Sequence, residues 1–359
     1  MDTAVSAFSL TDVKTLIDAR LLDYCKVRTV SAQQIGERYV LLWTAINSLF
    51  EAGGKRLRPY MLLTAFDAYA PDDDIEAIMP AALAQEMIHA AMLVHDDIID
   101  RDIIRYGVKN ISGQYEDVYK PHIKKASERA HMTQSSALLA GDVLISDAYR
   151  LISRVNRSQE TVTQAISILS NGVFDVVGGE LLDTESSFIP DLGISAETIA
   201  RFKTASYSFV SPLTMGATLA NAPAEQIALL RHFAELVGTA YQLKDDLLGV
   251  FGDEKETGKS TSTDIRESKK TVLIEQFKQC ATQSQQDTFF AIFNSDNATD
   301  QEISQARTIL LESGAKVRVD ERITELHGRA AAIIEQLTIN DSAKQSFHDL
   351  LALCLTRNS

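Results

Sequence analysis

Helix-forming patterns run along almost the whole chain, and strong helix breakers are scarce. The 359 residues include only 7 prolines, and none follows Pro223, so the C-terminal third has almost nothing to interrupt a helix. Apolar residues recur at steps of three and four, whereas alternating strand patterns bounded by turn residues are absent. The sequence therefore predicts an all-α fold, arranged as a single domain over residues 1–359 without an internal linker.

Charge and cysteine content narrow the class of protein. A net charge of -14 and a pI near 5.0 argue against a nucleic-acid partner, although a phosphorylated substrate needs only a local basic cluster. Cys25, Cys280 and Cys354 are widely scattered and lack metal-ligand spacing, which is typical of reduced thiols. No signal-peptide pattern and no run of about 18 apolar residues is present. We therefore expect a cytoplasmic protein without a transmembrane segment.

Carboxylates gather at the ends of two apolar helices that are far apart in sequence. The first predicted helix places Asp96 and Asp100 one turn apart on one face, with His89 two turns below Asp96. By itself this pattern also fits a solvated acidic helix end. A second pair, Asp245 and Asp246, follows another apolar helical run. Two such ends suggest two walls of one cavity that binds a cation, and oxygen ligands alone favour Mg²⁺.

A basic cluster leads into the helix predicted to begin near Pro59. Lys55, Arg56 and Arg58 follow the pair Gly53-Gly54, and proline suits the first turn of a helix. Free backbone N–H groups, the helix dipole and cationic side chains can together hold an anion there. A solvated basic turn has the same composition, so the cluster indicates an anion site only in combination with the acidic motifs.

Glycine, proline and polar residues predict where helices begin, break or give way to loops. The predicted boundaries are a first helix from Thr11 or Asp12, a second from about Ser31, a long mobile loop over 107–131, a break at Gly178-Gly179, and a kink or restart at Pro212. Asp147 is expected to be a solvated charge on a helix surface. The segment 251–271, rich in glycine, hydroxyl and charged residues, suits a flap over a phosphate site.

The order of these motifs resembles that of the trans-isoprenyl diphosphate synthases, the polyprenyl synthetase family of class I terpenoid synthases. The matching motifs, from about residue 35 to 275, are Gly-Gly-Lys-Arg-Leu-Arg-Pro (53–59), His89, Asp-Asp-Ile-Ile-Asp (96–100) with Arg105, Lys203-Thr204, Tyr-Gln-Leu-Lys-Asp-Asp (241–246), Gly258-Lys259 and Asp264. The resemblance implies one large helical bundle around a central cavity, with the C-terminal helices of 276–359 packed on it. It also implies a homodimeric prenyltransferase that condenses isopentenyl diphosphate with an allylic diphosphate.

The resemblance assigns a role to each matching residue. The implied ligands of three Mg²⁺ ions are Asp96, Asp100 and Asp245. The implied supporting carboxylates, beside metal and substrate, are Asp97, Asp246 and Asp264. The cations that would neutralise the allylic diphosphate are Arg105, Lys203 and Lys259. The residues that would bind the diphosphate of isopentenyl diphosphate are Lys55, Arg58 and His89, and those that would stabilise the allylic cation are Thr204 and Gln242.

Several positions depart from the family pattern. Tyr106 stands where a second arginine is usual, so one cation is missing unless Arg56 or Lys109 substitutes for it. Gly249 stands where aspartate is frequent, which we expect to matter little, and Glu180 stands where glutamine is usual. The predicted loop over 107–131 is also longer than is common in the family. None of these departures removes an implied metal ligand.

Side chains beneath Asp96 bear on the length of the product. Met92, Ile88 and Gln85 lie one, two and three turns below it and would line the floor of a tunnel. Short-chain members of the family commonly carry bulky aromatics four and five residues before the first Asp, where this chain has Met92 and Ala91. Since no aromatic ring plugs the tunnel, we expect geranylgeranyl diphosphate (C20) or a somewhat longer product.

Four alternatives remain open on the sequence alone. One is a farnesyl diphosphate synthase. Another is a non-catalytic subunit of a heteromeric synthase, although such subunits typically lose one Asp-rich motif. A terpene cyclase on the same fold is disfavoured by the second diphosphate site at Lys55, Arg58 and His89. The last is a helical scaffold with accidental acidic clusters.

Overall fold

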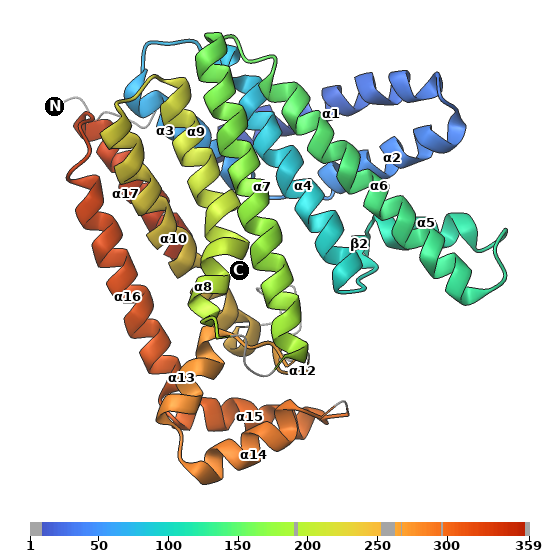
Figure 1. Cartoon of the computed structure of the whole chain (residues 1–359), viewed down its shortest axis with the longest axis vertical. Coiled ribbons are helices and arrows are strands. Elements are labelled where there is room, and N and C mark those ends of the chain that lie inside the picture. The colour runs from blue at the N-terminus through green and yellow to red at the C-terminus, as the bar shows by residue number, and fades with distance from the viewer. Residues whose placement is uncertain (1–8, 190–192, 253–262, 267, 296, 356–359) are drawn as a thin grey trace. The chain divides into compact units, whose positions relative to one another are not determined.

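Helices make up nearly all of the chain in the computed structural model, which describes residues 9–189, 193–252, 263–266, 268–295 and 297–355 (Figure 1). Contacts divide the chain into two compact units, described separately below. Unit 1 comprises residues 1–169 and 215–221, and unit 2 comprises 170–214 and 222–359. The all-α prediction is confirmed. The assignment of the whole chain to a single domain stays a prediction.

The elements of unit 1 are helices with a two-stranded hairpin. They are α1 (Leu10–Gln33), α2 (Glu37–Glu51), α3 (Leu57–Tyr69), the short 3-10 helix η1 (Ile75–Ala77), α4 (Met79–Ile99), β1 (Ile104–Arg105), β2 (Val108–Lys109), α5 (Ile111–Tyr119) and α6 (Ala126–Ile152). Helices α7 (Gln159–Phe188) and α9 (Ser211–Leu219) each have one part in either unit.

Unit 2 is built entirely from helices among its described residues. Besides its parts of α7 and α9, they are α8 (Ala196–Ala200), the π-helix η2 (Arg201–Val210), α10 (Ala224–Phe251), α12 (Thr263–Arg266), α13 (Val272–Cys280), α14 (Gln283–Phe293), α15 (Asp300–Glu312), α16 (Ala315–Ile334) and α17 (Asp341–Leu355). Helix α10 packs against both η2 and α16. A Cβ at Gly238 would lie 2.6 Å from Ala205, so the missing side chain lets α10 approach η2 closely.

Helix α4 lies against α6 in the core of unit 1 (Figure 1). A Cβ at Gly141 of α6 would lie 2.0 Å from Nε2 of His95, so glycine is what permits this approach. The apolar face of α4 is buried over most of its length, which fixes the direction of the face that carries Asp96.

The N-terminal helices begin at different residues from those predicted. Ser9, rather than Thr11 or Asp12, caps α1, since its hydroxyl accepts from the Asp12 N–H over 3.1 Å. Helix α1 continues through Ser31, and α2 starts only after Gly36, whose φ of 143° ends the intervening turn. The predicted helix start at Ser31 was therefore wrong by about six residues.

The predicted loop over 107–131 is instead largely ordered into β2, α5 and the start of α6. Asn110 caps α5, because its side chain accepts from the Gly113 N–H over 2.8 Å. A Cβ at Gly113 would lie 2.3 Å from the Ile103 carbonyl oxygen, so this glycine serves close packing. The loop prediction was wrong because glycine and polar residues were interpreted as flexibility.

The predicted break at Gly178-Gly179 was also wrong, since α7 runs through it without interruption. A Cβ at Gly179 would lie 2.2 Å from the Lys203 backbone nitrogen, so this glycine lets α7 touch η2. Pro212 falls in the first turn of α9, where the backbone changes from π-helix to α-helix. The predicted restart there agrees with this change.

Asp147 was expected to be a solvated charge, and this expectation was wrong. Its residue is 2% exposed, and its Oδ2 accepts from Arg28 Nε over 2.8 Å. The Arg28 guanidinium also stacks 5.2 Å from the ring centre of Trp43, which is fully buried. Asp147 therefore belongs to a structural ion pair that joins α1 to α6.

Helix α7 is long and apolar enough to cross a membrane by length and composition, and 28% of its most apolar window is buried. One such helix is weak evidence for a membrane span. The expectation that the chain has no transmembrane segment stays a prediction.

Candidate active site

The acidic end of α4 carries the first group of predicted residues, all in unit 1. The helix ends at Ile99, and Asp100 is its C-cap, donating its backbone N–H to the Asp96 carbonyl over 2.8 Å. Asp97 is turned inward and is 4% exposed, whereas Asp100 is exposed. Asp96 and Asp100 are therefore placed one turn apart at the helix end, as predicted from their spacing.

A tight hairpin returns the chain from this helix end toward α4. Ile104 pairs with Lys109 and Arg105 with Val108, and the two linking residues, Tyr106 and Gly107, have φ values of 53° and 75°. Two positive φ values in a two-residue turn match the twist of a hairpin. The turn thereby fixes β1, the strand that carries Arg105.

Arg105 clamps the two neighbouring carboxylates. Its Nε donates to Asp97 Oδ1 over 2.8 Å, and its Nη2 lies 2.7 Å from the same oxygen and 3.1 Å from Asp96 Oδ2. Burial raises the pKa of Asp97, and the hydrogen bond from Arg105 opposes this rise. Burial also lowers the pKa of Arg105, but the hydrogen bond and charge of Asp97 outweigh it, so the net shift is upward.

Positive charge gathers around His89 on the same helix. Burial, followed by the charges of Arg58, Arg105 and Arg56, lowers the pKa of His89 well below its usual 6.5. His89 is therefore neutral at pH 7 and can take part in hydrogen bonds without adding charge. The charges of Arg58, Arg105 and Arg56 make the surroundings of His89 electrostatically positive, which favours the binding of an anion.

Arg56 cannot substitute for the missing second arginine. It is 4% exposed, and its guanidinium donates over 2.7 Å to Asp18, to Glu86 and to the Phe50 carbonyl. Gly54 makes room for it, since a Cβ there would lie 2.9 Å from Arg56 Nη1. Arg56 is thus a structural residue that holds the turn before α3.

The remaining basic candidates near this turn are Lys55, Arg58 and Lys109. Lys55 and Arg58 flank Arg56 at the start of α3, where the helix exposes its first N–H groups. Lys109 forms an ion pair with Asp117 at 2.5 Å. The binding of an anion by Lys55 and Arg58 stays a prediction.

The second acidic group lies on α10 in unit 2. Thr204 Oγ1 donates to Gln242 Oε1 over 2.5 Å, and Gln242 Nε2 donates to Asp246 Oδ1 over 2.8 Å. Thr204 and Gln242, predicted to act together, are in direct contact. Their chain of hydrogen bonds fixes the amide orientation and points its N–H₂ group at the carboxylate.

Carboxylates are crowded around Asp246. Burial, together with the charges of Asp245, Asp264 and Asp183, raises the pKa of Asp246 to about 8, against the hydrogen bond from Gln242. Such an accumulation of oxygen donors and negative charge suits a hard divalent cation such as Mg²⁺. The donor set of unit 2 therefore fits the metal that the sequence implies.

Lys203 on η2 is held by two carboxylates of α7. Its Nζ lies 2.5 Å from Asp183 Oδ2 and 3.1 Å from Glu180 Oε2. Asp183 is not among the site residues predicted from the sequence. Its three-residue spacing from Glu180, next to Gly179, was the signal that both share one helix face.

Within the described ranges, no three His, Cys, Asp or Glu side chains form a group able to hold a metal ion. This is compatible with Mg²⁺, which usually keeps waters and takes substrate phosphate oxygens alongside one or two carboxylates. Lys259, predicted to contact the diphosphate, and Gly258 lie outside the described residues.

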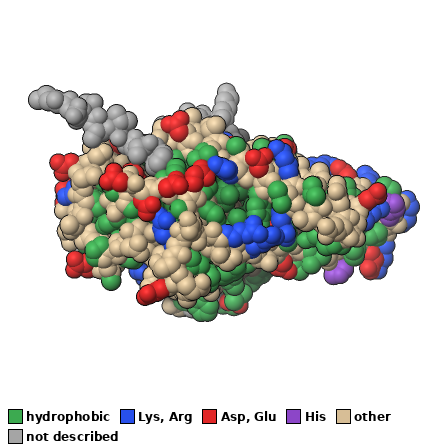
Figure 2. Space-filling model, turned by 90° about the horizontal axis from the view of Figure 1, so that it is seen from above, with side chains coloured by type: hydrophobic (Ala, Val, Ile, Leu, Met, Phe, Trp, Pro, Cys, Tyr) green, Lys and Arg blue, Asp and Glu red, His purple; other side chains and the backbone are tan. Residues whose placement is uncertain are grey.

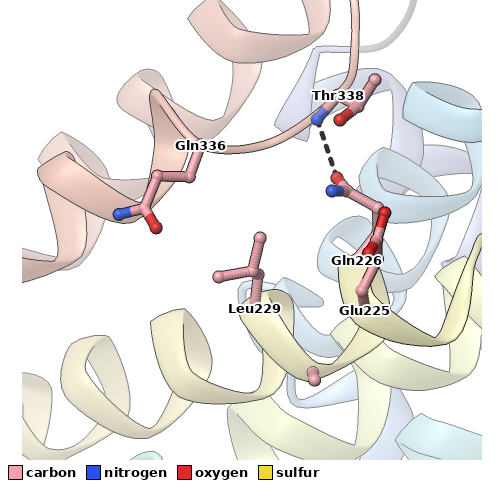
Figure 3. Close-up of a pocket in the computed structure, with 6 residues that line it drawn as sticks. Glu225, Gln226, Leu229, Gln336 and Thr338 are labelled. Atoms are coloured by element: carbon pink, nitrogen blue, oxygen red, sulfur yellow. Dashed lines mark hydrogen bonds between the residues drawn. The ribbon is translucent and has the colours of Figure 1, made fainter.

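A pocket near the start of α10 lies away from these residues (Figure 3). It is lined by Glu225, Leu229 and Gln336 together with Gln226, whose Oε1 accepts from the Thr338 N–H over 2.7 Å. At about 1.5 Å per residue, Asp245 is roughly 30 Å further along the helix. The pocket is therefore separate from the acidic cluster.

Basic side chains are concentrated locally even though the chain carries a net charge of -14. On the face drawn in Figure 2, Lys and Arg side chains gather into blue groups bordered by apolar surface. Local positive charge beside apolar surface suits a ligand with an anionic head and an apolar tail.

Comparisons with known proteins agree with this geometry. A sequence model of the polyprenyl synthetase family matches residues 40–310. A short chain isoprenyl diphosphate synthase of Methanocaldococcus jannaschii is 32% identical over 76% of this chain and 77% of its own. A geranylgeranyl diphosphate synthase of Sulfolobus acidocaldarius is 30% identical, over 75% and 76%.

Solved structures give the same result. The crystal structure of a geranylgeranyl pyrophosphate synthase from Corynebacterium glutamicum, complexed with isoprenyl diphosphate and magnesium, has a TM-score of 0.89 at 27% identity, covering 98% of this chain and all of that one. The match to the family extends over the acidic motifs of both units and the basic turn before α3. The chain is therefore a member of the polyprenyl synthetase family.

Proposed function

We propose that this protein is a trans-prenyltransferase that joins isopentenyl diphosphate head to tail to an allylic diphosphate, making geranylgeranyl diphosphate or a longer product. Relatives named geranylgeranyl, geranylfarnesyl and nonaprenyl diphosphate synthase support this range. One observation carries the proposal: α4 bears both Asp96 and His89. The positive charges of Arg58 and Arg105 act on His89 and lower its pKa.

Each cluster has a task in this proposal. Asp96 and Asp100 would hold two Mg²⁺ ions, and Asp245 would hold a third. When bound, Mg²⁺ would neutralise the charge that grows on the departing diphosphate. Arg105, Lys203 and Lys259 would bind the same diphosphate, while Lys55, Arg58 and neutral His89 would bind that of isopentenyl diphosphate. Binding that strengthens as the carbon–oxygen bond breaks lowers the barrier.

Thr204 and Gln242 would stabilise the allylic cation. The Thr204 hydroxyl donates a hydrogen bond to Gln242 Oε1. The lone pairs of Thr204 Oγ1 therefore remain available to an electron-poor carbon. Because the Gln242 amide is also committed to Asp246, neither group can easily rotate to attack the cation. The pair therefore supplies electron density without acting as a nucleophile.

We further propose that the protein is a homodimer that uses the exposed apolar face of α7. Phe174, Val177 and Leu181 follow helical spacing and are 79%, 55% and 57% exposed. A stripe of this kind on a long helix favours association with a second copy. A Phe174→Glu and Leu181→Glu double variant should be monomeric by light scattering, whereas a dimer in that variant would exclude this face.

The cytoplasmic location predicted from the sequence is part of the proposal. Cys25, Cys280 and Cys354 are free thiols, and no disulfide occurs among the described residues. Reduced cysteines are the rule in a reducing compartment.

The test is an incorporation assay with labelled isopentenyl diphosphate and C5, C10 or C15 allylic partners, followed by chromatography of the products. The proposal predicts label in C20 or longer chains. Products that stop at C15 would indicate a farnesyl diphosphate synthase, hydrocarbons without label would indicate a cyclase, and no turnover would contradict the proposal. Asp96→Ala or Asp245→Ala should abolish incorporation while circular dichroism stays unchanged.

A further inference from the structure

Gly249 lies directly against the carboxylate of Asp264 in unit 2. Gly249 follows Asp245 by four residues on α10, so it is one turn further along the same helix face. A Cβ at Gly249 would lie 1.9 Å from Asp264 Oδ2 and 2.9 Å from its Cγ. Real carbon atoms do not approach that closely, so the Asp264 carboxylate fills the space of a side chain at position 249.

The position of Asp264 is fixed from its other side. Lys269 Nζ lies 3.6 Å from Asp264 Oδ1, and the Lys269 backbone N–H donates to the Asp264 carbonyl over 3.0 Å. One carboxylate oxygen thus lies toward Lys269, and the other lies against α10. The charge of Asp264 acts on Asp246, which agrees with a place inside the acidic cluster.

We propose that Asp264 supplies the third carboxylate of the acidic cluster on α10, and that Gly249 is the residue that admits it. Aspartate is frequent in the family at the position of Gly249, where this chain has no side chain. The third carboxylate comes instead from α12, a separate helix. Asp264 is thus a positioning residue that acts through Asp245 and Asp246, an inference that rests on the proposed function.

The proposal predicts that a carboxylate can be moved from residue 264 to residue 249 with recovery of cation binding. Mn²⁺ binding in the presence of inorganic pyrophosphate, followed by electron paramagnetic resonance, measures this without turnover. Asp264→Ala should weaken Mn²⁺ binding by about 10- to 100-fold, which is typical for residues that support metal ligands. Adding Gly249→Asp to that variant should recover most of the loss.

Two variants separate charge from shape. Asp264→Asn keeps the volume of the side chain and should weaken Mn²⁺ binding as Asp264→Ala does. Gly249→Ala should also weaken it, because the new Cβ displaces the Asp264 carboxylate. The matched control is Gly328→Ala on α16, where a Cβ would meet no atom within 4 Å and binding should not change.

Wild-type Mn²⁺ affinity in Asp264→Asn would overturn the inference. A folded Asp264→Ala, Gly249→Asp variant with no recovery would do the same. Prenyl transfer by the unaltered protein is assayed in parallel. Its absence would refute the proposed function, whereas the Mn²⁺ titrations decide the role of Asp264 on their own.

Discussion

Arg105 Nε donates to Asp97 Oδ1 over 2.8 Å, across the gap between a two-residue strand and the end of α4. The side chains are 16% and 5% exposed, so the pair is shielded from solvent. The same guanidinium reaches Asp96 at 3.1 Å. Asp97 therefore orients the Arg105 guanidinium beside Asp96. In this way Asp97 can support the motif without being a metal ligand itself.

Loss of Asp97 should destabilise the protein. Asp97→Ala leaves Arg105 with only the longer contact to Asp96, and removing one partner of a buried ion pair typically costs about 3 kcal/mol. Urea denaturation measures the loss. The control is Asp117→Ala, which breaks an ion pair of the same hairpin whose side chains are 51% and 59% exposed, and should have little effect. Equal losses in both variants would show that Arg105 and Asp97 are not coupled.

Arg56 and Arg58 should have opposite phenotypes although they are two residues apart. Arg56→Ala removes three hydrogen bonds, two of them buried, and takes away the partner of Glu86 Oε1, so we expect a loss of at least about 3 kcal/mol in unfolding free energy. Arg58→Ala should instead raise KM for isopentenyl diphosphate by about tenfold or more with little change in Tm. Thermal denaturation and steady-state kinetics on both variants measure this, and a normal KM in Arg58→Ala would remove that residue from the site.

Local sequence patterns predicted the helices that carry the site but not the contacts that depend on distant partners. The apolar period was enough to place α4 and α10, with Asp96 and Asp245 near their ends. Asp147 was misjudged because its burial depends on Arg28, 119 residues away in sequence. Gly179 was misjudged because only the position of Lys203 shows that a side chain would clash there. The relation of Gly249 to Asp264 was missed for the same reason.

Glu180 should weaken the binding of the allylic diphosphate. Lys203 lies 3.1 Å from Glu180 and 2.5 Å from Asp183, so two carboxylates compete with any diphosphate for its charge. Glu180→Gln removes one competitor and should lower KM for the allylic substrate by about two- to fivefold, the scale of a partly exposed ion pair. The control is Glu185→Gln on the same helix. An unchanged or higher KM in Glu180→Gln would show that Glu180 instead holds Lys203 in its productive place.

Asp67 on α3 should make stability depend on pH. Burial raises the pKa of Asp67 above its usual 3.8, so the native protein holds this proton more tightly than the unfolded chain does. The contribution of protonated Asp67 to the free energy of unfolding is therefore complete below pH 3.8. It is lost as pH rises through the pKa of Asp67 in the native protein. Asp67→Asn removes the effect. The variant should gain stability relative to wild type as pH increases from 4 to 7, and a flat difference across urea titrations would contradict this.

Met92 should limit the length of the product. It lies one turn below Asp96 on α4, above Ile88, which is 2% exposed, and Gln85, which is 1% exposed and donates to the Met215 sulfur over 3.4 Å. A phenylalanine ring at Met92 is rigid where methionine is flexible, so Met92→Phe should shift the products toward shorter chains. Product chromatography measures the shift. Leu93→Phe adds similar bulk about 100° around the same helix and should leave the distribution unchanged. If both variants shorten the product equally, the added bulk acts through the packing of α4, and Met92 does not lie on the tunnel floor.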